Sequence, residues 1–122
     1  MIVEGEVIHG QQLGRRLGFP TANIDVEHVD NIENGVYLSR VEIDGHTYWA
    51  MSNVGVRPSV DGRQRLLETC VFDYSGDLYG RILRVELLQK IRDERKFASV
   101  DELKSRLEQD AAHIRSLAVV GL

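Results

Sequence analysis

Short apolar segments separated by turn residues fill the first three quarters of the chain. Segments of about four to eight residues in which apolar positions alternate or cluster, bounded by Gly, Pro, Asn or Asp, are typical of β-strands. Six segments of this kind are present, at residues 1–8, 19–26, 36–43, 46–54, 66–74 and 82–88. Their number and spacing predict an antiparallel β-barrel or β-sandwich.

Turn residues predict how neighbouring segments are joined. Asp44-Gly45 stands between two apolar runs, which is a strong hairpin signal. Residues 75–77, with the sequence Ser-Gly-Asp, predict a second hairpin between the last two segments. The stretch 55–65 is rich in turn residues, and we expect it to form a loop.

The hydrophobic period changes in the last quarter of the chain. Apolar residues there recur at steps of three and four, the spacing of one helix face; they are Val100, Leu103, Leu107, Ala111, Ile114 and Leu117. Ser99 and Glu102 have the spacing of a capping box, in which each side chain bonds the other residue's amide. The sequence therefore predicts one domain over residues 1–122, with a barrel over about 1–90 and a helix over about 99–118 packed on it.

Composition and charge limit the class of protein. The chain has 122 residues, with 15 basic and 19 acidic side chains, and its net charge of −4 gives no broad basic surface for nucleic acid. No apolar run approaches the roughly 20 residues that span a bilayer, and no signal peptide is visible. The single cysteine, Cys70, excludes an internal disulfide and is interpreted as a core thiol. We expect a monomeric cytoplasmic protein that binds small molecules and neither membrane nor nucleic acid.

The segment HGQQLGRRLGFPTANI, residues 9–24, is the first candidate for chemistry. Three evenly spaced glycines and two arginines stand in it: Gly10, Gly14, Gly18, Arg15 and Arg16. Glycine lets backbone amides approach an anion closely, and arginine can contact phosphate oxygens. The segment either binds phosphate or forms a surface loop with solvated arginines. It is not a Walker A loop, because no Gly-Lys-Ser/Thr ends it.

Thr21 and Asn23 follow in the same segment, two positions apart. Residues with this spacing on an extended strand point to the same side. Their hydroxyl and amide oxygens can help hold a hard cation such as Mg²⁺ when substrate phosphates complete its shell. Local hydrogen bonding near a strand end is the alternative explanation of the pair.

Two further positions are candidates for a site. Glu68 shares one strand face with apolar residues, so it is either a buried, paired carboxylate suited to general-base chemistry or part of a solvent-exposed face. Arg92 and Phe97 lie in a charged run before the predicted helix. They form either one wall of a ligand site, with Phe97 stacked on a flat ring, or a solvated connector. The pattern of residues leaves both alternatives open.

The segment 9–24 resembles the signature of the riboflavin kinase (flavokinase) family, and most of all the kinase module of bacterial bifunctional riboflavin kinase/FAD synthetases. The similarity continues through nearly the whole chain. Matching segments are Gly35-Val36-Tyr37, SNVGVRP at 52–58, LETCVFD at 67–73, DLYG at 77–80, IRDERKF at 91–97 and the closing helix with Asp110. Several motifs in the right order make this resemblance more specific than any one of them.

The resemblance implies a mainly β fold, a six-stranded antiparallel Greek-key (split) barrel with a C-terminal helix. It implies transfer of the ATP γ-phosphate to the ribityl 5′-hydroxyl of riboflavin, with Mg²⁺, to give FMN and ADP. Glu68 is then the catalytic carboxylate, and Thr21 and Asn23 hold the metal. The implied nucleotide-binding residues are Gly10, Gly14, Arg15, Gly18, Pro20, Thr21 and Asn23. The implied flavin-binding residues are Asp77, Tyr79, Arg92 and Phe97.

The sequence departs from the family pattern in two ways. Ser59 stands where the family often has threonine, which keeps a hydroxyl. No His-x-Gly-His nucleotide motif is present, so we expect FMN, and not FAD, as the product. The alternative to a kinase is a non-catalytic flavin- or nucleotide-binding barrel descended from it. The presence of Glu68 beside Thr21 and Asn23 favours the enzyme, because a simple binder does not need the carboxylate.

Overall fold

The computed structural model describes residues 1–10 and 13–119, and within them six strands and two helices follow one another. The strands are β1 (Ile2–Ile8), β2 (Ala22–Asp25), β3 (Gly35–Ile43), β4 (His46–Ser59), β5 (Gly62–Val71) and β6 (Ile82–Arg92). The helices are α1 (Leu13–Arg16) and α2 (Val100–Val119). In the part of the chain that is described, neither helix is long and apolar enough to cross a membrane.

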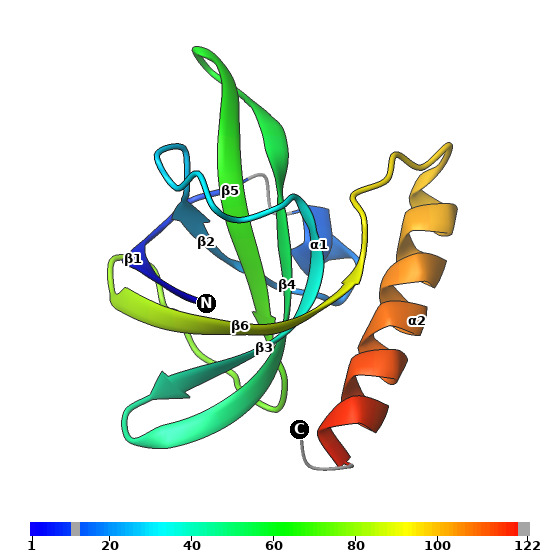
Figure 1. Ribbon diagram of the computed structural model, residues 1–122. Coiled ribbons are helices and arrows are strands. Elements are labelled where there is room, and N and C mark those ends of the chain that lie inside the picture. The colour runs from blue at the N-terminus through cyan, green and yellow to red at the C-terminus, as the bar shows by residue number, and fades with distance from the viewer. Residues whose placement is uncertain (11–12, 120–122) are drawn as a thin grey trace.

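The strands form a closed antiparallel barrel with the order β1-β2-β5-β4-β3-β6 (Figure 1). Strands β3, β4 and β5 are joined as consecutive hairpins, and β6 returns to pair with β3, which is Greek-key connectivity. β1 closes the barrel, because it pairs with β2 on one side and with β6 on the other. The predicted barrel is therefore confirmed, and the sandwich alternative is wrong.

The turn at Asp44-Gly45 joins β3 to β4 as predicted. Both residues have positive φ, 51° and 83°, and Ile43 pairs with His46 across the turn. Two positive φ values define a tight turn whose twist matches that of the two strands, which is why Asp-Gly is such a strong hairpin signal.

The hairpin predicted at residues 75–77 is wrong, because β5 and β6 are not neighbours in the barrel. Ten residues, 72–81, carry the chain from the end of β5 to the start of β6, which pairs with β1 and β3. Turn geometry does occur there: Asp77 Oδ1 accepts a hydrogen bond from the Tyr79 amide at 2.9 Å. A turn signal describes only local backbone, so it could not show which strand β6 would join.

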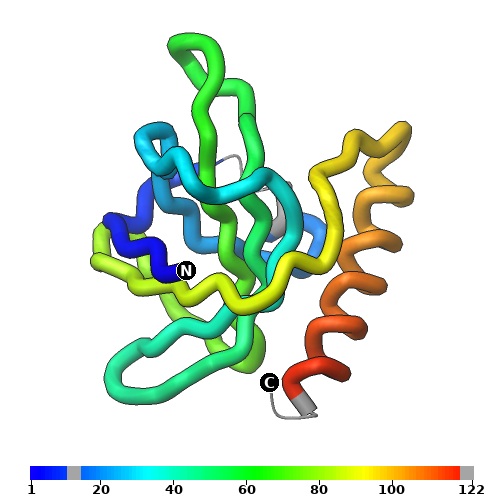
Figure 2. The backbone as a smooth tube through the Cα atoms, viewed as in Figure 1, coloured from blue at the N-terminus to red at the C-terminus, as the bar shows by residue number. Residues whose placement is uncertain are grey.

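The loop expected at 55–65 is also wrong, because β4 and β5 continue through it as one long hairpin. Their pairing extends to Ser59 and Gly62, and the hairpin projects beyond the rest of the barrel (Figure 2). Val60 at its tip is fully exposed. Both faces of the outer hairpin meet solvent, so its strands lack the apolar alternation by which strands are recognised.

The apolar residues pack in two clusters on opposite sides of the barrel wall. The barrel interior contains Val3, Val7, Ile24, Val26, Val41, Ile43, Val54, Leu67, Leu83, Val85 and Leu87, among others. The second cluster lies outside, between the wall and α2, and contains Val36, Leu38, Met51, Cys70, Phe72 and Ile114. Strands β3, β4 and β5 therefore bury both faces where α2 lies along them (Figure 1).

Helix α2 starts at a cap and is held by its apolar face. The Glu102 amide donates to Ser99 Oγ at 3.1 Å, which confirms the predicted cap, while the Glu102 carboxylate pairs with Arg95 instead of reaching back. Leu107, Ala111 and Leu117 pack against the outer cluster. The connector between β6 and α2 is therefore anchored at the first turn of the helix.

Candidate functional site

Thr21 lines two cavities that open among the described residues. The first cavity has a volume of about 520 Å³ and the second about 320 Å³. Thr21 directly precedes β2, so the strand start positions this hydroxyl where the two cavities meet. The predicted site residues divide between the cavities, and that division shows which of them can act together.

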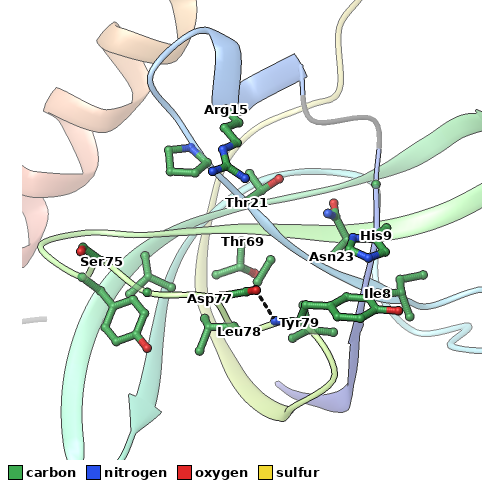
Figure 3. A pocket seen from close by; sticks show the side chains of 17 residues that line it. Ile8, His9, Arg15, Thr21, Asn23, Thr69, Ser75, Asp77, Leu78 and Tyr79 are labelled. Carbon is green, nitrogen blue, oxygen red and sulfur yellow. Dashed lines mark hydrogen bonds between the residues drawn. The ribbon is translucent and has the colours of Figure 1, made fainter.

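The first cavity lies between the start of β2, the end of β1 and the β5–β6 loop. Figure 3 shows Arg15 of α1 reaching toward Thr21, with Asn23 farther along the same wall. The rings of His9 and Tyr79 stack, with centroids 3.7 Å apart and an angle of 13° between their planes. Five of the seven predicted nucleotide-binding residues line this cavity, namely Gly10, Arg15, Pro20, Thr21 and Asn23. The other two, Gly14 and Gly18, are not part of its lining.

The glycine at position 10 is required by its contact with Asn23. A Cβ atom there would lie 2.6–2.8 Å from three atoms of the Asn23 side chain, which is closer than real Cβ contacts. The other glycines of the segment have different places. Gly14 belongs to α1, and Gly18, with φ of +89°, follows the end of that helix. Gln11 and Gln12 lie outside the described residues.

The predicted pairing of Thr21 with Asn23 is present, since both line the first cavity. Asn23 is buried on β2, and its amide lies beside Gly10. A hydroxyl and an amide oxygen suit Mg²⁺, which binds through few protein ligands and keeps waters or substrate phosphates in its shell. Within residues 1–10 and 13–119, no cluster of three or more His, Cys, Asp or Glu side chains offers a separate metal site. The donor set therefore fits a metal that arrives with a phosphate ligand.

The second cavity lies on the outside of the barrel wall, beneath α2 and the connector that precedes it. Its apolar lining consists of Phe19, Val36, Met51, Val56, Cys70, Phe97, Leu103 and Leu107. Its polar lining includes Asn53, Arg57, Glu68 and Glu94. A cavity with a largely apolar lining and some charged groups suits a flat ring system that carries a polar chain.

Glu68 lies on β5 in this second cavity, where both faces of the strand are covered. Its neighbour Leu67 points into the barrel core, and Cys70 packs under α2. The Glu68 side chain is only 19% exposed, and Arg57 donates two hydrogen bonds to its Oε1, at 2.8 and 3.1 Å. This decides the question that the pattern left open: the carboxylate is half-buried and paired.

Arg57 is shared between two carboxylates. Besides bonding Glu68, its Nη1 donates to Glu94 Oε2 at 3.2 Å and its Nη2 to Glu94 Oε1 at 3.3 Å. Burial acts to lower the pKa of Arg57, but the charges of Glu68 and Glu94 raise it above its usual value. The guanidinium is therefore a permanent positive charge between two negative ones.

Glu68 lies in a row with two asparagines across three neighbouring strands. It pairs in register with Asn23 on β2 and with Asn53 on β4. Residues directly opposite one another in an antiparallel ladder have Cβ atoms about 4.5–5.5 Å apart. The carboxylate of the second cavity is therefore next to a candidate metal ligand of the first.

Asn53 is a site residue that the sequence did not single out. Its Oδ1 is buried, and among the described residues it has no hydrogen-bond partner. A buried acceptor of this kind is costly to leave unsatisfied, so a donor on a bound molecule would stabilise it. The only sequence signal was an asparagine within an apolar strand, and that signal does not show which way the side chain points.

Arg92 and Phe97 lie together in the second cavity, as the wall interpretation requires. Arg92 donates to both carboxylate oxygens of the buried Asp110, with its shortest bond at 2.7 Å. Its guanidinium carbon is 5.8 Å from the centre of the Phe97 ring. Arg92 therefore joins the end of β6 to α2, and it packs near Phe97 on the same side of the cavity.

Asp77 and Tyr79 lie elsewhere. Both line the first cavity, together with Thr21 and Asn23, whereas Arg92 and Phe97 line the second. The four residues predicted to contact flavin are thus not brought together in one place.

The fold and these cavities define a small barrel that can hold two ligands next to each other, one polar and one largely apolar. A family model described as "Flavokinase: Riboflavin kinase" matches residues 1–118. The chain belongs to the riboflavin kinase family.

Individual relatives agree with this family. The chain is 44% identical over 117 residues to the bifunctional riboflavin kinase/FMN adenylyltransferase of Pseudomonas fluorescens, covering 95% of this chain and 38% of that protein. It is 45% identical over 107 residues to the enzyme of the same name from Haemophilus influenzae, covering 87% of this chain and 35% of that protein. The chain thus spans little more than a third of the length of these relatives.

A solved structure at lower identity shows the same fold. The riboflavin kinase of Trypanosoma brucei superposes with a TM-score of 0.66 at 24% identity, covering 95% of this chain and 78% of that one. At this identity the likeness bears on the barrel and its helix, and it agrees with the closed six-stranded topology.

Proposed function

We propose that the chain transfers the γ-phosphate of ATP to the ribityl 5′-hydroxyl of riboflavin, giving FMN and ADP. The observation that carries this proposal is the position of Glu68, a paired carboxylate in the apolar cavity whose register partner Asn23 lines the polar one. A base at the junction of two ligand cavities is suited to a reaction between the two ligands. Membership of the riboflavin kinase family supports the same reaction.

The first cavity is the proposed nucleotide site. Gly10 and Arg15 are placed to meet phosphate oxygens, and Thr21 and Asn23 to hold Mg²⁺ together with those phosphates. The metal, when bound, neutralises charge that develops on the transferred phosphoryl group. Because Asp77 and Tyr79 line this cavity, we assign both of them to the nucleotide side.

The second cavity is the proposed flavin site. Its apolar lining can cover the isoalloxazine ring, and Phe97 offers an aromatic face for stacking. The unpartnered Oδ1 of Asn53 offers an acceptor to a hydroxyl or ring N–H of the ligand. The ribityl chain then extends toward Thr21, where the two cavities meet.

Glu68 acts on the hydroxyl that attacks. Both hydrogen bonds from Arg57 end on Oε1, and among the described residues Oε2 receives none. Oε2 accepts the hydroxyl proton as the new O–P bond forms and the bond between the γ-phosphorus and the β,γ-bridging oxygen breaks. Phosphoryl transfer depends mainly on positioning and charge stabilisation, so few protein groups are needed.

The test is direct. The protein is incubated with riboflavin, ATP and MgCl₂, and the flavins are separated by chromatography. FMN formed in equal amount to ADP supports the proposal. Riboflavin that binds but is not converted would favour a non-catalytic flavin-binding barrel, and riboflavin that neither binds nor reacts would exclude both.

A further inference from the structure

The connector between β6 and α2 contributes a carboxylate to the second cavity, beside Arg57 and Glu68. Glu94 lies in this connector, and its two oxygens accept from Arg57 at 3.2 and 3.3 Å. Arg57, on β4, in turn holds Glu68 on β5. Three segments that are distant in the sequence are thus joined through one guanidinium.

Gly55 leaves the space in which this guanidinium lies. A Cβ atom at position 55 would come within 2.6 Å of both Arg57 Nη1 and Glu94 Oε2. Gly55 is inside β4, and its φ is outside the left-handed region, so its backbone does not require glycine. The absence of a side chain at this position therefore serves the contact between Arg57 and Glu94.

The chemistry of arginine suits this arrangement. A planar guanidinium presents five N–H donors in a fixed fork, so one arginine can bond two carboxylates at once. The side chains of Arg57, Glu68 and Glu94 are only 19–30% exposed. Water and salt therefore screen their charges less than they would screen fully exposed groups. The second carboxylate fixes the orientation of Arg57, and Arg57 fixes that of Glu68.

We propose that Arg57 and Glu94 are positioning residues for the phosphoryl transfer: Glu94 holds Arg57, and Arg57 holds Oε1 of Glu68 so that Oε2 faces the attacking hydroxyl. This inference rests on the proposed function. The connector that carries Glu94 also carries Phe97, which lines the flavin side of the cavity. A flavin that packs against the connector therefore also sets the orientation of the base.

The first test is Glu94→Gln, which keeps the size of the side chain and removes its charge. We expect kcat to fall about tenfold, equivalent to about 1.4 kcal/mol, because Arg57 loses one of the two charges that fix its orientation. The KM for ATP should change less than twofold, because Glu94 does not line the first cavity. Gly55→Ala should give the same pattern without changing any charge.

Asp93→Asn is the matched control. Asp93 is the neighbouring carboxylate of the connector, and its ion pair is with Lys90, which does not line the second cavity. We expect its kcat to equal that of the wild type. Equal kcat values for Glu94→Gln and Asp93→Asn would overturn the proposal.

The second test asks whether Glu94 acts through Glu68. The double variant Glu68→Gln/Glu94→Gln should be as slow as Glu68→Gln alone, because the positioned group is already lost. A further tenfold loss in the double variant would show an independent role and contradict the proposal. Arg57→Lys should also have a lower kcat than the wild type, because lysine keeps the positive charge but cannot bond both carboxylates with a planar guanidinium.

Riboflavin affinity separates this inference from the proposed function. If the wild type formed no FMN, the proposed function would fail, and fluorescence titration of the same variants would decide the coupling. A double variant whose affinity departs at least about threefold from the product of the single effects supports coupling through Arg57. Additive effects would show that the two carboxylates are not coupled.

Discussion

The first cavity is formed mostly by loops and strand ends, whereas the second lies between a packed helix and the barrel wall. In the first, the β5–β6 loop and the segment before β2 supply most of the lining. In the second, α2 and its connector cover three strands and share their apolar cluster. The exposed loop residues of the first cavity can therefore change at little cost in folding, while the lining of the second cavity is part of the packing that holds α2 in place.

Buried ion pairs also distinguish the packed helix region from the first cavity. Asp110, on α2, is 2% exposed and is bonded by Arg92 and Arg106. The charged residues that line the first cavity are Arg15 and Asp77. Among the described residues, neither of them forms a buried ion pair like that of Asp110. Five experiments would sharpen or break this comparison between the cavities.

Glu68→Gln should have the largest effect. Loss of a general base typically reduces turnover by about 10²–10⁴-fold, while the amide keeps the shape of the side chain. Calorimetry should show that riboflavin and Mg-ATP still bind. Turnover near that of the wild type would remove Glu68 from the mechanism and leave the junction between the cavities without a base.

Asp110→Asn should mainly reduce stability. Breaking a buried ion pair leaves Arg92 without its charged partner and typically costs about 3 kcal/mol. Chemical denaturation should show this loss of unfolding free energy. The control is Asp77→Asn in the first cavity, where the side-chain oxygen can still accept from the Tyr79 amide and stability should hardly change. Equal losses in the two variants would contradict the division between loop-built and packed cavities.

Thr21→Ala removes the hydroxyl at the junction of the two cavities. We expect Mg-ATP to bind about twentyfold more weakly, since a ligand of a hard cation is lost, and riboflavin to bind with little change. Titration of each ligand by calorimetry would measure both. Thr21→Ser should restore nucleotide affinity; if it does not, the methyl group and not the hydroxyl is the important part of this side chain.

Phe97→Ala and Tyr79→Ala test the assignment of the aromatic residues. Loss of a stacked ring costs on the order of 1 kcal/mol, or about fivefold. Phe97→Ala should raise the KM for riboflavin by about this factor, and Tyr79→Ala the KM for ATP. A rise in the riboflavin KM for Tyr79→Ala would instead return Tyr79 to the flavin side, as the sequence resemblance implies.

Cys70 provides a probe of the second cavity with a smaller effect. Burial raises the pKa of its thiol to about 11, so the reactive thiolate is scarce below that pH and alkylation should be slow. Because Cys70 lines the second cavity, riboflavin should slow its alkylation a few-fold further at pH 9, while ATP should not. Mass spectrometry of iodoacetamide-treated protein measures both rates. Equal protection by the two ligands would show that the cavities are not separate.

The elements of the fold were predictable where the signal was local. Alternation predicted the strands, Asp44-Gly45 predicted its hairpin, and the three- and four-residue period predicted α2. The partner of β6 was not predictable, because a turn at 75–77 is compatible with more than one continuation of the chain. The outer half of the β4–β5 hairpin was missed because both of its faces are solvated.

The candidate site was predictable as a set of residues but not as a geometry. Thr21 with Asn23, and Arg92 with Phe97, are close in sequence, and each pair lies in one cavity. Arg57 and Glu94 are 37 positions apart, and only the closed barrel with its connector brings them together. A residue pattern does not predict a contact between distant segments, so the cluster of Arg57, Glu68 and Glu94 was not predictable from the sequence.

Closure of the barrel has a consequence for how the chain folds. Ile2 of β1 pairs with Glu86 of β6, so the first strand cannot complete its ladder until the last strand is present. During synthesis, the edge of β1 that pairs with β6 therefore remains unpaired while more than half of these residues are still being made. Pairings between such distant residues are slow to form, because the entropy of loop closure is lost before the contacts are gained. Refolding should accordingly be limited by the joining of β1 to β6, and a chain in which these two strands are not yet paired exposes open strand edges that favour aggregation.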